Sequence, residues 1–187
     1  SLGKASSNDL IGVWGQSPKS WRGEAIASRT STSVLRIEDA FLRSVLPGRS
    51  REPPLGLHID TRGVHFDPSK TSDLEMILQE GSLDDSAILS RSHDCAETIK
   101  EAHLSKYNAF DPNTPAPDAG YVLVIDQTAG DASVTASHAD RNTFLKMLLV
   151  ARKEHPSAHI LIKTHPETTA GYRNGYYCNA DASDNVA

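Results

Sequence analysis

The chain has 187 residues, of which 38% are hydrophobic and 6% aromatic, a composition that is lean but globular rather than disordered. This length is enough for one ordinary domain or for parts of two smaller lobes. The formal net charge of −5 excludes broad, non-specific binding to nucleic acid, because no excess of cations is available for phosphates. Eight histidines allow phosphate-facing chemistry without establishing it.

The cysteines and apolar segments narrow the class of protein further. Only Cys95 and Cys178 occur, with no CxxC pair, so we expect neither a disulfide framework nor a zinc site, as in a reducing cytoplasm. No stretch approaches the ~18 apolar residues that a transmembrane helix needs, and no signal-peptide core opens the chain. Because the chain does not begin with Met and Gly171–Ala187 has little hydrophobic periodicity, we expect a fragment or a processed chain.

The first elements are predicted to be a strand, a helix and a second strand. The apolar run Leu10–Trp14 ends at Gly15 and is typical of a buried strand, and capping residues at 17–20 begin a helix to about Ser28. Val34–Ile37 is the second predicted strand. This order favours a parallel sheet whose strand-end loops carry the ligands.

A hairpin and a capped helix are predicted next. Leu55–Ile59 and Val64–Phe66 flank the turn-forming Asp60–Gly63, which indicates a hairpin or a short meander. Ser72 and Glu75 have the spacing of a capping box and predict a helix to about residue 80.

A longer helix and a proline-rich linker follow. The helix is predicted from near Leu83 to about Leu104, with apolar residues spaced for a buried stripe. The residues of this stripe are Ile88, Leu89, Ala96, Ile99 and Ala102. Three prolines within Asp111–Pro117 favour a stiff, extended connection. We therefore expect a first lobe at residues 1–111, a linker at 112–119 and a second lobe at 120–187.

The pattern restarts after the linker as one βαβ unit. Tyr121–Ile125 predicts a buried strand, Ala139–Arg152 a helix and His159–Ile162 another strand, joined by a parallel right-handed crossover. The helix residues expected to face inward are Phe144, Leu145, Leu148 and Ala151.

Both strands of this unit lead into loops with reactive side chains. The first strand runs into Asp126–Ser133 and the second into Lys163–Glu167. Because loops after parallel strands emerge at the same edge of a sheet, we expect Asp131 and His165 to face one crevice. A carboxylate there can act as nucleophile or base, and a histidine can bind or protonate a phosphate leaving group.

Structural interpretations of the same residues stay open. Asp126 and Asp131 can each cap a turn or helix, and His165–Pro166 can be a plain loop. Gly130 would let the backbone approach a ligand. Lys163 either adds a cation at this edge or is simply a solvated side chain.

The first lobe offers a second cluster of charges in Arg36–Ser44, where two carboxylates lie between two arginines. Glu38 can be a general base while Arg43 holds an anionic substrate. The alternative is a salt-bridged helix start, which is favoured for Asp39. Gly15 is either a backbone-approach turn for a ligand or a plain strand-end glycine. No cluster has metal-ligand spacing, so we predict no metal.

Together these segments resemble the capsule polysaccharide biosynthesis and export proteins of the KpsC/LipB type. Five motifs in family order carry the similarity between about residues 10 and 170, namely Val13–Gly15, Arg36–Ser44, Leu104–Asn108, Val124–Val134 and Lys163–Glu167. The resemblance implies an α/β fold of the GT-B-like kind, with two Rossmann-like lobes and parallel sheets. The second lobe of such a protein continues well past residue 187, so we expect it to be truncated here, and the tail after Tyr172 lacks family character.

The resemblance also implies a retaining β-Kdo transferase that takes Kdo from CMP-Kdo to a lipid-linked acceptor. Carried across, His165 would bind or protonate the CMP phosphate, and Asp131 would be the nucleophile of a double displacement, with Asp126 as the alternative. Glu38, reaching over from the first lobe, would be the acid/base for the acceptor hydroxyl. The other positions expected on the substrate side are Gln127, Gly130, Ser133, Lys163, Thr164, Pro166, Glu167, Arg43 and Gly15.

The expected partners are a nucleotide-sugar donor, a lipid-linked saccharide acceptor and the capsule export machinery at the inner membrane, with no nucleic acid and no cofactor. The expected location is cytoplasmic, with a peripheral position at the inner membrane as a further expectation. An alternative from another class is a non-catalytic carbohydrate- or nucleotide-binding component of capsule export. A third is an inactive fragment with a partial fold.

Overall fold

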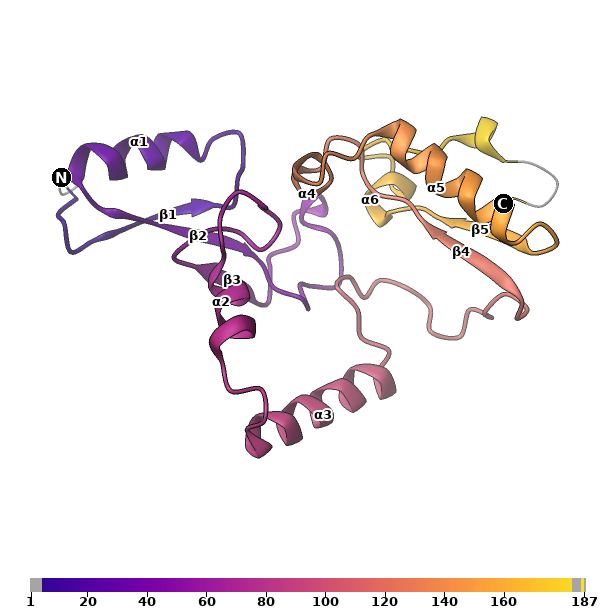
Figure 1. Ribbon diagram of the computed structural model, residues 1–187, viewed down its shortest axis with the longest axis horizontal. Coiled ribbons are helices and arrows are strands. Elements are labelled where there is room, and N and C mark those ends of the chain that lie inside the picture. Colours follow the sequence, from indigo (N-terminus) through magenta and orange to yellow (C-terminus); the bar gives the residue numbers. More distant parts are fainter. Residues whose placement is uncertain (1–4, 183–185, 187) are drawn as a thin grey trace. The chain divides into compact units, whose positions relative to one another are not determined.

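The computed structural model describes residues 5–182 and Val186, so residues 183–185 and 187 of the predicted tail lie outside it. The chain divides into two compact units, Ser1–Phe110 and Asp111–Ala187 (Figure 1). The predicted linker at 112–119 lies at the start of the second unit. In chain order the elements are β1 (Leu10–Trp14), α1 (Trp21–Thr30), β2 (Ser33–Asp39), η1 (Gly48–Ser50), β3 (Leu57–Asp60), α2 (Asp73–Glu80), α3 (Ser86–Glu101), β4 (Tyr121–Ile125), α4 (Ala132–Ala136), α5 (Arg141–Glu154), β5 (His159–Lys163), α6 (Pro166–Thr169) and η2 (Asn179–Asp181).

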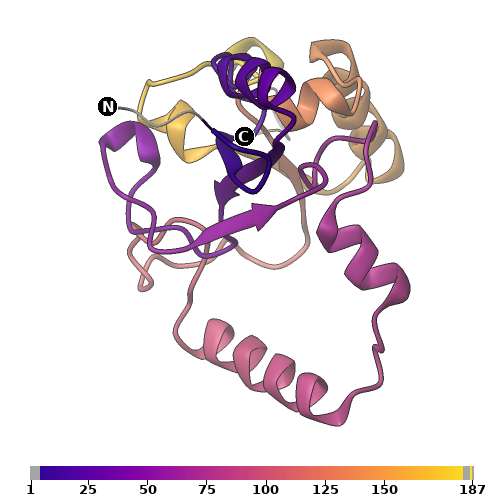
Figure 2. The same ribbon diagram turned by 90° about the vertical axis from the view of Figure 1, so that its left-hand side faces the viewer.

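The first unit is built on a three-stranded sheet in the order β1-β2-β3. β1 and β2 are parallel, with Leu10 opposite Ser33, and α1 connects them and packs on one face of the pair (Figures 1 and 2). The buried side chains of Val13 and Ala27 come from β1 and α1. The predicted strand–helix–strand arrangement is confirmed.

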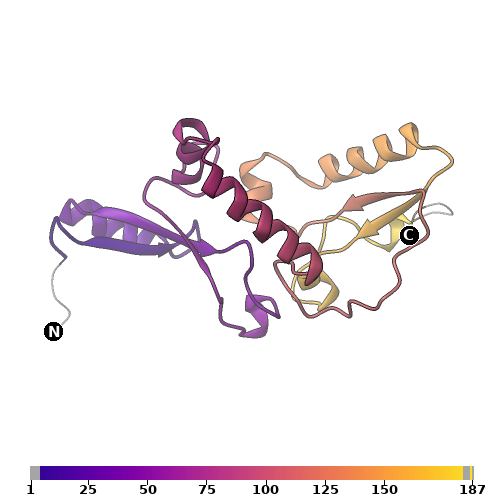
Figure 3. The ribbon, with the colours of Figure 1, turned by 90° about the horizontal axis from the view of Figure 1, so that it is seen from below.

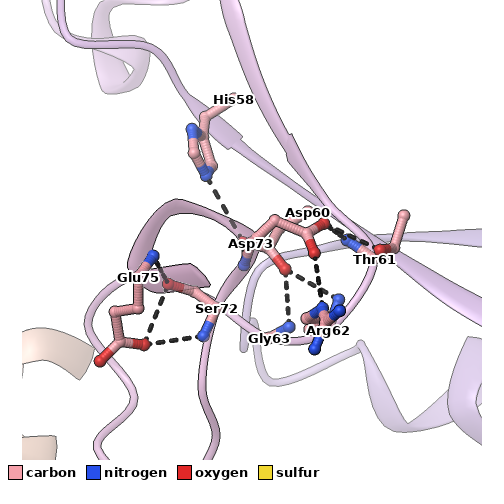
Figure 4. A network of polar contacts seen from close by, with 8 residues as sticks. All are labelled: His58, Asp60, Thr61, Arg62, Gly63, Ser72, Asp73 and Glu75. Carbon is pink, nitrogen blue, oxygen red and sulfur yellow. Dashed lines mark hydrogen bonds and ion pairs between the residues drawn. The ribbon is translucent and has the colours of Figure 1, made fainter. Parts of the chain in front are cut away.

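The predicted hairpin over residues 55–66 is wrong. Its first arm is β3, which pairs antiparallel with β2, but Val64–Phe66 in the described structure is not a strand. The buried carboxylate of Asp60 accepts the backbone N–H groups of Arg62 at 2.8 Å, Gly63 at 2.7 Å and Asp73 at 2.8 Å (Figure 4). These bonds fold residues 60–63 into a tight turn and tie the start of α2 to the end of β3.

α2 begins and ends as predicted, and α3 lies within the range predicted from near Leu83 to about Leu104. Ser72 Oγ accepts the Glu75 N–H at 3.2 Å while Glu75 accepts the Ser72 N–H at 2.7 Å, which is the predicted capping box (Figure 4). The predicted buried stripe on α3 is wrong, since none of its residues, all of them described, is buried. Ile88 and Leu89 are 59% and 53% exposed, and Figure 2 shows α3 standing apart from the sheet of its own unit.

The second unit contains the predicted βαβ arrangement. β4 and β5 are parallel, with Tyr121 opposite His159, and α5 lies along them (Figure 3). Its core contains a cluster of four buried residues, Val124, Leu148, Ile160 and Val186. Apolar burial between the helix and the strand pair is what fixes the position of the strand-end loops.

The segment that follows α6 packs on α5. Tyr176 stacks on Phe144, with ring centroids 4.3 Å apart and an angle of 6° between the rings, and the Tyr177 hydroxyl donates to the Phe144 carbonyl at 2.6 Å. Burial, together with nearby carboxylates, raises the pKa of Tyr177 to about 12, so its hydroxyl remains a donor at neutral pH. Arg141 pairs with both oxygens of Asp181 at 3.0 and 3.1 Å. Residues 176–181 are therefore a structural part of the unit.

We expect Asp60→Asn to lower the stability of the first unit by about 1–3 kcal/mol at neutral pH, because three N–H groups lose a buried carboxylate acceptor. Burial alone would raise the pKa of Asp60, but the N–H groups of Gly63, Arg62 and Asp73 outweigh it and hold that pKa below its ordinary value of 3.8. The contribution of Asp60 is thus present above the unfolded-state pKa and is lost as the pH falls through the folded-state pKa.

The measurement is urea denaturation at neutral and acid pH, followed by the fluorescence of Trp14 and Trp21, which both lie in the first unit. The variant should show a weaker loss of stability below about pH 4 than the wild type. Asp118→Asn, at an exposed aspartate before β4, is the control and should leave the profile unchanged. Equal pH profiles for wild type and Asp60→Asn would contradict the prediction.

Candidate functional site

Two loops leave the sheet of the second unit side by side. Ile125 at the end of β4 lies opposite Lys163 at the end of β5, and the Asp126 N–H donates to the Lys163 carbonyl at 2.9 Å. The loop after β4 leads to Asp131, and the turn after β5 contains His165. The structure thus places both loops at one edge of the sheet, as their position after parallel strands predicts. The side chain of Lys163 is exposed there.

The His-Pro turn after β5 starts the short helix α6. Pro166 takes the first helical position, where its missing N–H costs nothing, and His165 is the N-cap. His165 Nδ1 accepts the Glu167 N–H at 3.1 Å, so in the neutral ring the proton is carried by Nε2, which is then a donor. A 2.9 Å hydrogen bond between the hydroxyls of Thr164 and Thr169 closes the turn.

Asp131 is the N-cap of α4 and is also accessible. Its Oδ1 accepts the Ser133 N–H at 2.9 Å and the Ser133 hydroxyl at 2.6 Å, and its side chain is 37% exposed. The preceding residue, Gly130, has a φ of +70°, in the left-handed region that favours glycine. Asp131 can therefore be both the N-cap of α4 and a reactive carboxylate, because the hydrogen bonds with Ser133 orient its side chain without burying it.

Asp126, the alternative nucleophile, has a different environment. Its side chain is 1% exposed; Oδ1 accepts the N–H groups of Gln127 at 2.8 Å and Tyr176 at 2.9 Å, and Oδ2 that of Tyr177 at 3.4 Å. A Cβ at Gly175 would lie 2.0 Å from Oδ2, so only glycine allows this approach. Since its oxygens are engaged by backbone donors and shielded from solvent, Asp126 serves as an anchor, and Asp131 is favoured as the reactive carboxylate.

Residues 172–177, here called the strap, connect the two loops. The Tyr172 N–H donates to the Glu167 carbonyl at 2.8 Å, at the His-Pro turn. Further along the strap, the Asn174 carbonyl accepts the Ala129 N–H at 2.7 Å, next to Gly130 and Asp131. The strap therefore ties both loops of the candidate site to each other.

The strap contributes two site residues that the sequence interpretation missed. Arg173 Nη2 donates to the Ala129 carbonyl at 2.7 Å, and Nη1 lies 3.8 Å from Asp131 Oδ2. The Tyr176 hydroxyl accepts the Gly130 N–H at 3.2 Å. The only signal for these contacts in the sequence is the density of Tyr, Gly and Asn at 171–177, which is typical of an ordered turn but carries no periodicity.

In the first unit, Gly15 makes room for Glu38. A Cβ at Gly15, whose φ is +39°, would lie 1.6 Å from Glu38 Oε1. Arg36 donates to the Gly15 carbonyl at 2.6 Å, and Glu38 lies opposite His58 in the β2–β3 pairing. The close approach that Gly15 permits in this structure is to Glu38, which accounts for the glycine without a ligand.

Arg43, predicted to hold an anionic substrate, is buried and engaged within its own loop. Its Nε lies 2.9 Å from Asp39 Oδ1, and Nη1 donates to the Ser44 hydroxyl at 2.6 Å and to the Glu52 carbonyl at 3.0 Å. Residues 40–47, all described, form no helix, so the predicted ion pair is right and the predicted helix start is wrong. These contacts favour a structural role for Arg43.

This loop also joins two of the sequence motifs. The carbonyl of Lys106, in the Leu104–Asn108 motif, accepts the backbone N–H groups of Arg43 at 3.2 Å and Ser44 at 3.3 Å. The Asn108 side chain donates to the Ser44 carbonyl at 3.1 Å. The two motifs therefore form one structural feature of the first unit.

Three further observations concern metals, thiols and membranes. Within residues 5–182 and Val186, no group of three or more His, Cys, Asp and Glu side chains is placed to hold a metal ion. Cys95 and Cys178 are exposed free thiols. Across the same described residues, no helix has both the length and the apolar character needed to cross a membrane.

Each compact unit contains a parallel strand–helix–strand arrangement, and the second has an acidic loop and a His-Pro turn at one edge of its sheet, so this is an α/β protein. The chain belongs to the capsule polysaccharide biosynthesis protein family, whose profile matches residues 9–118 and 111–185. The second match includes the strap, so the expectation that the tail after Tyr172 lacks family character is wrong.

Two curated relatives illustrate the family. The chain is 35% identical over 155 residues to the lipopolysaccharide-processing protein LpsZ of Rhizobium meliloti, covering 80% of this chain and 35% of LpsZ. It is 34% identical over 169 residues to the capsule polysaccharide modification protein LipA of Neisseria meningitidis serogroup A, covering 87% of this chain and 24% of LipA. The chain thus spans about a quarter to a third of the length of these relatives.

Two solved structures are similar over most of the chain. Thermosulfurimonas dismutans KpsC, beta Kdo 2,4 transferase, matches with a TM-score of 0.83 and 32% identity, covering 94% of this chain and 55% of that chain. Thermosulfurimonas dismutans KpsC, beta Kdo 2,7 transferase, matches with a TM-score of 0.58 and 29% identity, covering 84% and 48%. These similarities confirm the predicted fold class and the KpsC-type family.

Substitutions of the two aspartates in this loop should change the free energy of unfolding by different amounts. Asp126→Asn should lower the free energy of unfolding by about 1–3 kcal/mol, because an amide cannot accept all three buried N–H groups. Asp131→Asn is the matched control: asparagine is an equally good N-cap, and the long, partly exposed contact to Arg173 contributes little, so we expect a change of less than about 0.5 kcal/mol. Denaturation followed by circular dichroism measures both. An Asp126→Asn chain as stable as the wild type would refute the anchoring role.

Proposed function

We propose that this chain carries the donor-binding loops and the nucleophile of a retaining glycosyltransferase that moves Kdo from CMP-Kdo to a lipid-linked acceptor in capsular polysaccharide biosynthesis. Membership of the capsule family and the similarity to two Kdo transferases support the reaction class. The observation that carries the proposal is the accessible Asp131 carboxylate, oriented by Ser133, in the loop beside the His165 turn.

In the first step, an oxygen of Asp131 attacks C2 of Kdo, and the bond from C2 to the phosphate oxygen breaks. The electron pair of that bond leaves with CMP. His165 Nε2–H donates a hydrogen bond to the departing phosphate oxygen and so stabilises the charge that develops on it. Lys163, exposed at the same strand end, adds a positive charge to this edge. The product of the step is an ester between Asp131 and Kdo.

In the second step, the acceptor hydroxyl attacks C2 from the opposite face, and the ester bond breaks with its electron pair returning to Asp131. Glu38 accepts the hydroxyl proton. Two inversions at C2 give net retention of configuration. The role of Glu38 is supported by its motif and by the way Gly15 leaves room for its carboxylate at the ends of β1 and β2.

The proposal also covers the partners of the reaction, its place in the cell and its need for a metal. The partners are the nucleotide-sugar donor, a lipid-linked saccharide acceptor and the capsule export machinery, in the cytoplasm at the periphery of the inner membrane. We also retain the prediction of a reaction without a metal or cofactor, because no Asp-x-Asp pair follows a strand in this sequence.

CMP should raise the melting temperature of the protein, and this rise should depend on the imidazole of His165. His165→Asn is the informative variant, since asparagine preserves the N-cap of α6 while removing the Nε2 donor; His165→Ala should behave in the same way towards CMP. His155→Ala, at an exposed histidine after α5, is the control. No thermal shift of the wild type with CMP would refute the assigned donor.

Intact-protein mass spectrometry with CMP-Kdo should detect a Kdo adduct on the wild type and none on Asp131→Asn, because an amide is a poor nucleophile. The thermal shift with CMP should survive this substitution. An adduct on Asp131→Asn would refute the assigned nucleophile. Binding of CMP-Kdo to the wild type without adduct or turnover would favour the non-catalytic binding component.

Glu38→Gln should separate the two steps. The Kdo adduct should still form, while transfer to the acceptor should slow by about 10²–10⁴-fold, the usual contribution of a general base. Single-turnover kinetics with pre-formed adduct measures the second step alone. Glu97→Gln, the same change on the exposed helix α3, should have no effect. Slowed adduct formation with normal transfer would contradict the assignment.

A further inference from the structure

The strap fixes one permanent cation beside the proposed nucleophile. Arg173 is anchored at one end of its guanidinium, where Nη2 donates to the Ala129 carbonyl at 2.7 Å, and its Nη1 lies 3.8 Å from Asp131 Oδ2. A guanidinium offers five N–H donors and no acceptor. The sequence motifs after β4 and β5 do not include this residue.

The contact between Arg173 and Asp131 leaves the guanidinium able to bind another anion. A charge-assisted hydrogen bond between these groups is about 2.7–2.9 Å long, so a separation of 3.8 Å is an ion pair without a tight hydrogen bond. The Arg173 side chain is 23% exposed.

The chemistry of the donor supplies an anion at this position. Kdo is a keto-acid sugar, and its anomeric carbon C2 carries the C1 carboxylate. When an oxygen of Asp131 approaches C2 to about 3–3.5 Å, the C1 carboxylate comes within a few ångströms of the same oxygen. Two carboxylates at that separation repel each other unless a cation lies between or beside them. Arg173 is the guanidinium adjacent to Asp131 Oδ2.

We propose that Arg173 binds the carboxylate on the anomeric carbon of the donor sugar and thereby selects a keto-acid sugar over a neutral one. This inference rests on the proposed function, because it needs Asp131 as the nucleophile and a sugar whose anomeric carbon is bonded to a carboxylate. The guanidinium keeps its hydrogen bond to Ala129 and offers Nη1 to the sugar carboxylate. It screens the repulsion between that carboxylate and Asp131 while the C2–phosphate bond breaks.

The test compares three ligands and three variants. The ligands are CMP, CMP-Kdo and a CMP-Kdo analogue whose C1 carboxylate is replaced by a neutral carboxamide. The variants are Arg173→Gln, Arg173→Lys and Arg141→Lys. The last is the matched control, because Arg141 holds the same tail through the Tyr176 carbonyl and Asp181 and has no described contact with Asp131. Calorimetry gives the affinities, and mass spectrometry gives the rate of adduct formation.

The wild type should form the adduct faster with CMP-Kdo than with the carboxamide analogue. In Arg173→Gln the ratio of these two rates should fall by about 10- to 100-fold. Arg173→Lys should recover part of it, since a point charge remains without the planar fork. The affinity for CMP alone should be unchanged in all variants, because CMP lacks the sugar carboxylate. Arg141→Lys should discriminate between the two donors as the wild type does.

The outcomes separate the two levels of the proposal. If the wild type forms the adduct but Arg173→Gln discriminates between the donors equally well, the role of Arg173 is overturned and the proposed function stands. If Arg173→Gln and Arg141→Lys lose discrimination together, the effect comes from a loosened tail, and the role of Arg173 is again overturned. If the wild type neither binds CMP-Kdo nor forms an adduct, the proposed function fails and this inference fails with it.

Discussion

The buried carboxylate of Asp126 is the interaction on which the candidate site of the second unit depends. It receives the N–H groups of Gln127, Tyr176 and Tyr177 in a place almost closed to solvent. A buried carboxylate without such donors would be strongly unfavourable, so the strap has to stay against the end of β4 for the unit to be stable. Together with the backbone bond between Ala129 and Asn174, this group joins the loop that carries Asp131 to the segment that carries Arg173.

The elements of the second unit were predictable because their signals are local. The apolar run Tyr121–Ile125 is β4 with the predicted bounds, and β5 and α5 differ from prediction by one or two residues at their ends. The position of the His-Pro turn follows from the strand before it. The strap was not predictable, because the bonds of Asp126 join residues 50 and 51 positions apart and use backbone N–H groups, which any residue but proline offers. No periodicity records such a contact.

In the first unit, the sequence patterns predicted hydrogen bonds within one helical turn better than they predicted which residues other elements cover. The spacing of Ser72 and Glu75 predicted the capping box, since both partners lie within one helical turn. The apolar spacing on α3 predicted a shared face, but not whether another element covers it, and Ile88 and Leu89 are exposed. The turn after β3 was misjudged for a related reason. Its residues suit a hairpin, yet the Asp60 carboxylate accepts the N–H groups of Arg62 and Gly63 within the turn and that of Asp73 at the start of α2.

The chain and the proposed donor are both negatively charged. The donor must therefore be bound by groups that contact it directly. With a net charge of −5, the protein has no general attraction for a ligand that carries a phosphate and a carboxylate. Binding must then come from donors at close range, where screening by salt is weakest. Lys163 ends β5 and His165 lies in the turn after it, whereas Arg173 belongs to the strap. Arg173 is also held by its bond to the Ala129 carbonyl, and the strap by the bond between Ala129 and Asn174. Loosening the Asp126 anchor would therefore weaken the support of Arg173 while leaving Asp131 capped by Ser133, so the buried aspartate helps to hold the charge that the accessible one encounters.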